Sequence, residues 1–202
     1  MTDPVKRRPS GRHHGDLRSV LERAALELVA EKGPHGFSLN EASRRAGVSV
    51  AAPYKHFADR GALLAALAET GYREQRERFA AAVGAADSPP DQMAAFAAAY
   101  VYFAAQEPAL FDITFYAGLD KSRHPELAEA GDALLETLMP VARALAPDED
   151  AAFDLLLRVA AAAHGQAVFL RQGLFGVDGD ALAETADRAA RSAHAIVAGL
   201  GG

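Results

Sequence analysis

The stretch from residue 37 to residue 57, FSLNEASRRAGVSVAAPYKHF, constrains the fold of this chain more than any other. Ser38 followed by Glu41 forms a capping box, in which the two side chains satisfy backbone N–H groups at the start of a helix. Gly47 then ends that helix, because glycine adopts the left-handed conformation without a steric penalty. A short first helix is therefore predicted between Ser38 and Gly47.

Ser49 is a favourable N-cap for a second helix, which is predicted to run from residue 50 to residue 56. Two short helices joined by a glycine-containing turn make a helix-turn-helix, whose second helix can enter the major groove of DNA. Small side chains let such a helix approach base edges, whereas basic and hydroxyl side chains can bind phosphate oxygens. The candidate DNA contacts are Ser38, Arg44, Ser49, Val50, Ala51, Ala52, Tyr54, Lys55, His56 and Arg60.

The helix-turn-helix lies within a longer ordered set of motifs between about residues 17 and 65. In chain order the set comprises an apolar helix at 17–29, EKG at 31–33, Ser38, AGVS at 46–49, YKHF at 54–57 and DRGALL at 59–64. With these motifs the chain resembles the tetracycline-repressor-like (TetR) transcriptional regulators, and AAPY at 51–54 resembles one branch of that family. The sequence departs from the commoner pattern at Ala42-Ser43 and at Arg60-Gly61.

The resemblance implies a homodimeric transcriptional regulator, most often a repressor. It implies a three-helix head that binds a near-palindromic operator and a larger helical body that binds a small-molecule effector. Ala163-His164-Gly165 also resembles a Trp-His-Gly segment of one C-terminal domain of the family, although the tryptophan is absent here.

The charge of the chain is divided unevenly between its two ends. Residues 1–60 carry 11 Lys and Arg against 7 Asp and Glu, a net of +4, and the remainder carries 10 against 20, a net of −10, which together give −6. A basic end and an acidic body indicate that one end binds a polyanion, with chance surface charge as the alternative. The basic residues 1–15 are predicted to be a flexible tail, which either reaches along DNA or only solubilises the terminus.

Composition and motifs exclude several other classes. The chain has no cysteine, so neither a disulfide framework nor a thiolate metal site is possible. Its seven histidines show no metal-binding spacing, and no nucleophile elbow, P-loop or dinucleotide fingerprint is present. We therefore expect no metal, no cofactor and no enzymatic activity. No signal peptide opens the chain and its apolar runs are interrupted, so a soluble, cytoplasmic protein without a membrane span is expected.

Apolar residues recur at helical spacing along the chain, which predicts an all-α fold of about nine helices. The head is predicted to be a three-helix unit and the body a larger helical bundle. Asp91 is expected to cap the helix that follows the break at residues 84–90, and Pro140 to kink or break a later helix. The predicted domains are a tail at 1–15, a DNA-binding domain at 16–60 and an effector-binding and dimerisation domain at 61–202.

The body also concentrates aromatic residues, with polar side chains among them. Such a mixture is typical of a small-molecule pocket, although each aromatic residue taken alone also fits an ordinary core position. The candidate effector contacts are Tyr100, Phe103, Phe111, Phe115, Tyr116, His164 and Phe169.

The last two predicted helices are rich in alanine, which lets helices approach closely. They are predicted to join with those of a second copy in a homodimer, because one helix-turn-helix makes few base contacts; packing within one subunit is the alternative. Two rival functions remain open: a small-molecule binding protein with a vestigial helix-turn-helix, and an enzyme built on an α-helical bundle.

Overall fold

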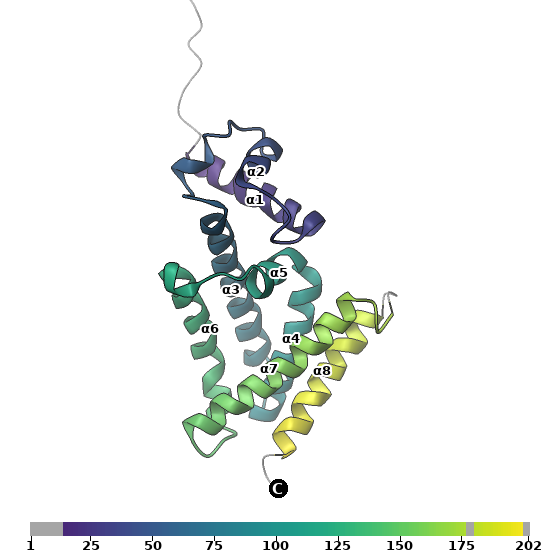
Figure 1. Cartoon of the computed structure of the whole chain (residues 1–202). Helices are drawn as coiled ribbons and strands as arrows, with labels where there is room; N and C mark the ends of the chain where they lie inside the picture. Colours follow the sequence, from purple (N-terminus) through teal and green to yellow (C-terminus); the bar gives the residue numbers. More distant parts are fainter. Residues whose placement is uncertain (1–13, 177–179, 200–202) are drawn as a thin grey trace, which may run out of the picture.

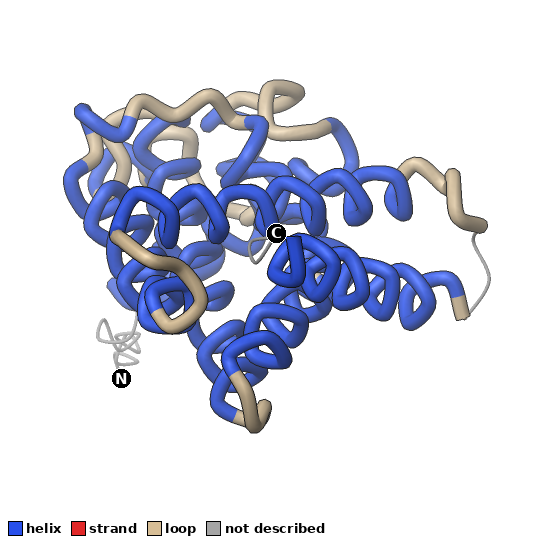
Figure 2. The backbone as a smooth tube through the Cα atoms, turned by 90° about the horizontal axis from the view of Figure 1, so that it is seen from below, coloured by secondary structure: helices blue, strands red, loops and turns tan. Residues whose placement is uncertain are grey.

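The computed structural model describes residues 14–176 and 180–199, and in that part the chain is built from helices and loops without strands (Figure 1 and Figure 2). The described α-helices are α1 (His14–Lys32), α2 (Leu39–Arg45), α3 (Arg60–Gly84), α4 (Pro89–Gln106), α5 (Pro108–Tyr116), α6 (Pro125–Arg143), α7 (Glu149–Arg171) and α8 (Ala181–Ala198). Two short 3₁₀ helices are η1 (Pro53–Lys55) and η2 (Lys121–Arg123). The predicted all-α fold is thus confirmed. Most of the predicted basic tail, residues 1–13, lies outside the described residues.

The head is formed by α1, α2, η1 and the start of α3. The buried face of α1 carries Leu21, Ala25 and Leu28, at the helical spacing read from the sequence, and packs with Phe37 and Phe57. These side chains build an apolar core that continues onto the first turns of α3 and reaches α5 and α6. The head is therefore fixed to the body by shared core residues.

The turn of the helix-turn-helix follows the prediction. The Ser38 hydroxyl accepts a hydrogen bond from the Glu41 amide at 3.2 Å, which is the predicted N-cap of α2. Gly47 has a φ of +70°, a conformation that glycine adopts at little cost.

The prediction of a continuous second helix from residue 50 to residue 56 is wrong in its detail. The segment forms a turn followed by the three-residue helix η1. Pro53 has no N–H to donate to the carbonyl of Ser49, and that carbonyl instead accepts the amide of Ala52 at 2.9 Å. Hydrogen bonds to the third preceding residue therefore replace the α-helical pattern here.

Helix α3 passes from the head into the body as one element of 25 residues (Figure 1). The Asp59 side chain caps it by accepting from the Ala62 amide at 2.8 Å. Leu63 and Leu67 near its start belong to the core of the head, whereas Phe79 near its end belongs to the core of the body.

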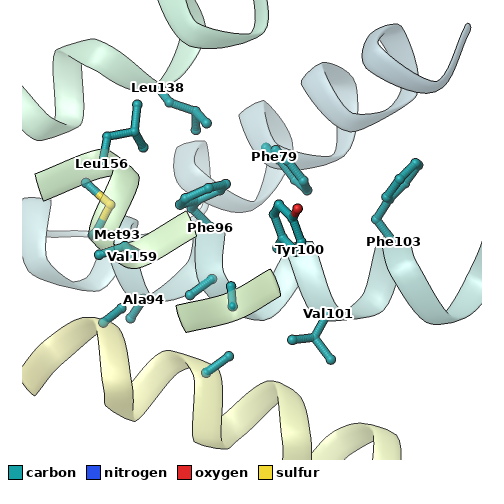
Figure 3. Close-up of a cluster of buried hydrophobic side chains, with 14 of the residues drawn as sticks. Phe79, Met93, Ala94, Phe96, Tyr100, Val101, Phe103, Leu138, Leu156 and Val159 are labelled. Atoms are coloured by element: carbon teal, nitrogen blue, oxygen red, sulfur yellow. The ribbon is translucent and has the colours of Figure 1, made fainter. Parts of the chain in front are cut away.

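The body packs around α4, which contacts α3, α7 and α8. Figure 3 shows the centre of this core, where Phe79 meets Phe96, Tyr100 and Phe103. The ring centroids of Phe79 and Phe96 lie 5.2 Å apart in an edge-to-face arrangement, and Phe79 stacks on Tyr100 at 5.8 Å. Such aromatic pairs add specific geometry to the burial of apolar surface.

Two local predictions in the body are corrected by the structure. Ser88 rather than Asp91 caps α4, because its side chain accepts from the Asp91 amide and two prolines occupy the first turn. Of the kink or break predicted at Pro140, the break is wrong, because α6 continues to Arg143. Pro140 lies in the last turn, where the carbonyl that loses its partner belongs to Glu136, an exposed residue.

Helices α7 and α8 lie side by side at one edge of the body (Figure 1). Within the described part of the chain, α7 is the one helix long and apolar enough to cross a membrane by length and composition. Its inner face, including Leu155 and Val159, is buried against the rest of the body, as expected for a core helix of a folded domain. Elsewhere on α7, Leu157 and Phe169 are 48% and 46% exposed.

Candidate DNA-binding surface and effector cavity

Most of the candidate DNA contacts lie on the outer surface of the head. Exposed residues of this set are Ser38, Arg44, Ser49, Val50, Ala51, Tyr54 and Lys55, and half-buried ones are Ala52, His56 and Arg60. Val50 and Tyr54 are 52% and 57% exposed and lie close together in the chain. A segment that displays such side chains beside a lysine has the composition of a surface that binds another molecule.

Arg60 is placed differently from the other candidates. Its guanidinium donates to the carbonyl of Pro34 at 3.0 Å and lies over the ring of Phe37 at 5.8 Å. These contacts hold the loop between α1 and α2 against the start of α3. They favour a structural role for Arg60, and its predicted phosphate contact remains a prediction.

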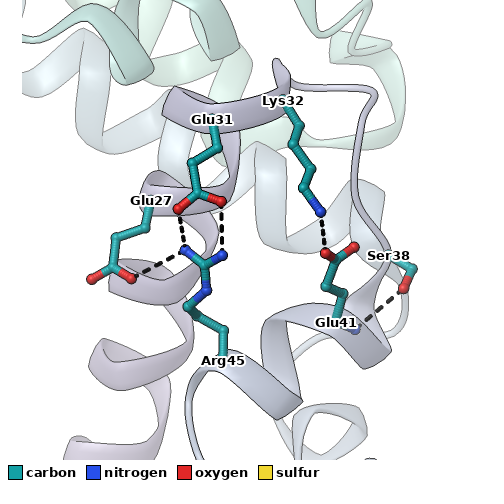
Figure 4. Close-up of polar contacts among 6 residues, drawn as sticks. All are labelled: Glu27, Glu31, Lys32, Ser38, Glu41 and Arg45. Carbon is teal, nitrogen blue, oxygen red and sulfur yellow. Dashed lines mark hydrogen bonds and ion pairs between the residues drawn. The ribbon is translucent and has the colours of Figure 1, made fainter.

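Figure 4 shows how two other basic residues of the head are occupied by ion pairs. Arg45 donates two hydrogen bonds of 2.7 Å to the carboxylate of Glu31, and Lys32 pairs with Glu41. The hydrogen bond from Arg45 holds the pKa of Glu31 below its usual value. These pairs tie α1 to α2, whereas Arg44 and Lys55 make no ion pair with any described residue.

A second connection joins the head to the body besides α3. His35, in the loop between α1 and α2, donates a hydrogen bond from Nε2 to the backbone carbonyl of Tyr116 at 2.8 Å. Tyr116 is the last residue of α5, and α5 also packs on α1 and α3. The end of α5 is therefore bonded directly to the loop that precedes α2.

The body contains a cavity of about 310 Å³ bordered by α3, α4, α5, α6, α7 and η2. Phe79 and Tyr100 form part of its wall, together with leucines of α6 and α7 such as Leu138 and Leu156 (Figure 3). Its volume lies at the lower end of the range of small-molecule sites, and its wall is mostly apolar with a few polar groups, as in such sites.

The seven candidate effector contacts separate into four groups around this cavity. Tyr100 and Phe115 border it directly. His164 contacts the rings of Phe115 and Tyr116 without bordering the cavity, and Tyr116 is 45% exposed. Phe103 and Phe111 are fully buried core residues. The seventh, Phe169, is largely exposed and packs edge-on against Phe175, with ring centroids 6.0 Å apart.

His164 joins three of these aromatic residues into one network. Its Nδ1 lies 2.9 Å from the Tyr100 hydroxyl and its Nε2 lies 3.4 Å from the Tyr116 hydroxyl. Its ring also stacks on that of Phe111 at 5.3 Å. Burial lowers the pKa of His164 and raises the pKa of the Tyr100 phenol, so both side chains are neutral at pH 7. The network thus links the wall of the cavity to Tyr116, the residue whose carbonyl holds His35.

The candidate effector contacts did not include most of the residues that border the cavity, among them Tyr72, Gln75 and Lys121. Gln75 and Tyr72 lie on the face of α3 that Phe79 also occupies, and Lys121 comes from η2. The spacing of Tyr72, Gln75 and Phe79 at i, i+3 and i+7 was a usable signal, because it places all three on one helix face. Lys121 gave no such signal, since only tertiary packing brings η2 to this helix.

A second concave region, of about 420 Å³, lies where the head meets the body. It is bordered by charged and polar side chains that include Arg18, Glu69 and His124. Within the described residues no group of three or more His, Cys, Asp or Glu side chains is arranged to hold a metal ion. The 310 Å³ cavity is the better candidate for an effector site, because its wall is mostly apolar.

Two family models match the chain. A model described as bacterial regulatory proteins of the tetR family matches residues 22–67. A model described as the C-terminal domain of tetracyclin repressor-like proteins matches residues 93–193. A search of curated proteins found no match.

Solved structures with the same fold cover nearly the whole chain. A protein of unknown function from Rhodococcus sp. RHA1 is 32% identical, with a TM-score of 0.75 over 93% of this chain and 98% of that one. A tetR-family regulatory protein from Rhodococcus RHA1 is 19% identical, with a TM-score of 0.70 over 90% and 97%. The TetR-family regulator PfmR from Thermus thermophilus is 20% identical, with a TM-score of 0.65 over 88% and 96%.

Proposed function

The chain belongs to the tetracycline-repressor-like family of bacterial regulatory proteins, and we propose that it is a ligand-responsive repressor that binds a near-palindromic operator as a homodimer. Family and fold are those of DNA-binding transcriptional regulators rather than of enzymes. The observation that carries the proposal is the exposed segment 49–55, which follows a capped helix and a glycine turn and displays Val50, Tyr54 and Lys55.

In the proposed complex the turn and η1 enter the major groove. Ala51 and Ala52 approach base edges or thymine methyl groups, because their side chains are small enough to allow close contact. The polar candidates on the surrounding surface, namely Ser38, Arg44, Ser49, Tyr54, Lys55 and His56, bind phosphates and fix the register. Arg44 and Lys55 are suited to this role, since neither is paired with an acidic residue of the described chain.

The proposed dimer forms through α7 and α8. The outer face of α7 combines the exposed apolar side chain of Phe169 with small residues such as Ala161 and Gly165. Association of this face with its copy would bury the apolar surface and place two heads against two half-sites of an operator. An action in the cytoplasm follows from this role.

The effector is proposed to bind in the 310 Å³ cavity and to change the spacing of the two heads. Two routes lead from the cavity to the head. One is α3 itself, which carries Tyr72 and Gln75 in the cavity wall and begins beside the DNA-binding segment. The other runs through Phe115 and Tyr116 at the end of α5 to His35. A coupling free energy of about 1–3 kcal/mol would change DNA affinity by roughly 5–150-fold.

The test is the binding of the purified protein to DNA fragments from its own upstream region. The binding is measured at about 0.15 M salt with excess nonspecific competitor, because phosphate contacts are strongly salt-dependent. A retained complex that protects a near-palindromic sequence is expected. If no complex forms with these fragments, a genome-wide pull-down tests for distant operators. If that pull-down also recovers no specific DNA, the repressor proposal is wrong. Ligand binding without DNA binding would then identify a small-molecule binding protein with a vestigial helix-turn-helix.

A further inference from the structure

The polar end of the effector cavity carries a buried donor without a partner. Gln75 is 1% exposed, and its side-chain Nε2 has no hydrogen-bond partner among the described residues. Gln75 borders the cavity from the middle of α3. An unpaired buried N–H destabilises a folded protein, so a group of this kind at the wall of a cavity indicates a ligand that accepts a hydrogen bond there.

Lys121 provides a second donor at the same end of the cavity. Its Nζ lies 4.8 Å from the centre of the Tyr72 ring, and Tyr72 stands one helical turn before Gln75. Gly131 of α6 lies against this ammonium group, since a Cβ built at Gly131 would be 3.0 Å from Nζ and 3.8 Å from the Tyr72 ring. The glycine thereby leaves room for the lysine head group beside the cavity.

The two donors specify the polarity of the ligand. The amide of Gln75 can present either its nitrogen or its oxygen by rotation about the Cγ–Cδ bond, whereas an ammonium group only donates. A ligand group that contacts Lys121 must therefore accept a hydrogen bond, and the unpaired Nε2 of Gln75 can donate to the same group. Asp132 also borders the cavity and forms no ion pair with Lys121 in the described part of the chain, where the Lys121 ammonium lies over the Tyr72 ring.

The rest of the cavity wall indicates that the remaining part of the ligand is apolar and small. Phe79, Phe96 and the leucines of α6 and α7 contribute no polar side chain. At about 30 Å³ per non-hydrogen atom, the share that a water molecule takes in the liquid, a cavity of 310 Å³ holds roughly ten such atoms. We infer that the effector is a small acyl compound, with a carbonyl or carboxylate oxygen held by Gln75 and Lys121 and a short apolar tail against the leucines and phenylalanines. This inference rests on the proposed effector role of the cavity.

The first experiment compares three probes that share one tail and differ in head group. Octanoate, octanamide and octylamine are titrated calorimetrically into the purified full-length protein. The two acyl probes are expected to bind, and octylamine at least about tenfold more weakly, because its ammonium group cannot accept a hydrogen bond and faces Lys121. Equal or tighter binding of octylamine, or no binding of either acyl probe, would overturn the inference.

The second experiment removes each donor in turn. Gln75→Leu and Lys121→Met are each expected to weaken octanoate binding by roughly tenfold or more, and Lys121→Met should affect the uncharged octanamide less. Gln166→Leu is the control for the first, because Gln166 is another largely buried amide of the body and does not border the cavity. Arg123→Met is the control for the second, since Arg123 lies on the same 3₁₀ helix. Unchanged octanoate affinity in both donor variants would refute the assignment.

Folding of the variants is checked by thermal melting. Gln75→Leu is expected to melt no lower than the parent protein, because it removes an unpaired buried N–H. If it does not fold, Gly131→Val supplies the test, since its side chain would occupy the space beside Lys121 and Tyr72 and should lower octanoate affinity. DNA retention is measured in parallel without ligand. Retained DNA binding with failed acyl binding rejects only the ligand class, whereas acyl binding without DNA binding rejects only the repressor proposal.

Discussion

The crossing of α3 and α5 offers a direct test of how tightly the head and the body are joined. Gly71 lies at this crossing, and a Cβ built there would be 2.7 Å from the Oγ1 of Thr114 and 3.6 Å from the carbonyl of Leu110. The Thr114 hydroxyl donates to that same carbonyl at 2.8 Å, so it cannot turn away without losing the bond. Gly71→Ala should therefore push α5 away from α3.

Two opposing contributions set the expected change in the free energy of unfolding for Gly71→Ala. Replacing glycine by alanine within a helix stabilises it by about 0.5–1 kcal/mol. Inserting a methyl group into a well-packed contact costs about 1–3 kcal/mol, because neighbouring groups must shift. Gly84→Ala is the matched control on the same helix, since nothing lies within 4 Å of a Cβ at Gly84. The free energy of unfolding of the two variants is expected to differ by about 1–3 kcal/mol, with Gly71→Ala the less stable.

The assay is urea unfolding followed by circular dichroism, at one fixed protein concentration because dimer stability depends on concentration. A double-mutant cycle isolates the contact: in a Thr114→Ala background, Gly71→Ala should become neutral or stabilising, since the clashing oxygen is gone. If Gly71→Ala alone stabilises the protein as much as Gly84→Ala does, Thr114 moves without cost and the argument for a rigid crossing fails.

Four further predictions concern the head, the interface and the network. Lys55→Ala should weaken binding to all DNA sequences and reduce the slope of log affinity against log salt by about one unit per half-site; an unchanged slope would remove Lys55 from the phosphate contacts. His35→Ala should reduce the effect of a ligand on DNA affinity while leaving ligand-free DNA binding within a few-fold, as measured by operator titrations with and without ligand. Ala161→Arg should shift the protein from dimer to monomer in analytical ultracentrifugation, because Ala161 is exposed on the outer face of α7; a dimer that persists would place the interface elsewhere. The lowered pKa of His164 means that the folded chain takes up a proton on this residue only at a lower pH than the unfolded chain, whose pKa is the ordinary 6.5. Stability is therefore intact above that pH and falls as the pH drops below it. His164→Gln should weaken this loss between pH 7.5 and pH 5 in thermal melting, and an unchanged pH profile would assign the loss to other groups.

The comparison of sequence and structure is most informative in the head. The capping box at Ser38 and Glu41 and the glycine turn at Gly47 were predicted, because each depends on residues within a few positions. The second helix was predicted from the same local signals, yet Pro53 replaces it with a turn and η1. The missing N–H of proline changed which hydrogen bonds could form, and sequence spacing alone gave too little weight to that loss.

In the body, helical periodicity indicated which apolar residues share one face of a helix. It did not indicate which of these residues border a cavity. Phe103, Phe111, Phe115 and Tyr100 all lie in aromatic segments, and only the last two reach the cavity. Which face of a helix meets a neighbour and which meets a void depends on how helices cross, and crossing geometry is set by side chains distant in the chain.

The sequence by itself determined the all-α class, the helix-turn-helix and the family, since these depend on short-range patterns of capping, turn and apolar residues. Only the tertiary structure decided that Gln75 and Lys121, 46 positions apart, share one end of a cavity, and that His35 is bonded to Tyr116. It also decided that Arg60 contacts the loop before α2. The physical reason is that an isolated polar residue carries no periodic signal, and its partner is fixed only when several helices pack together.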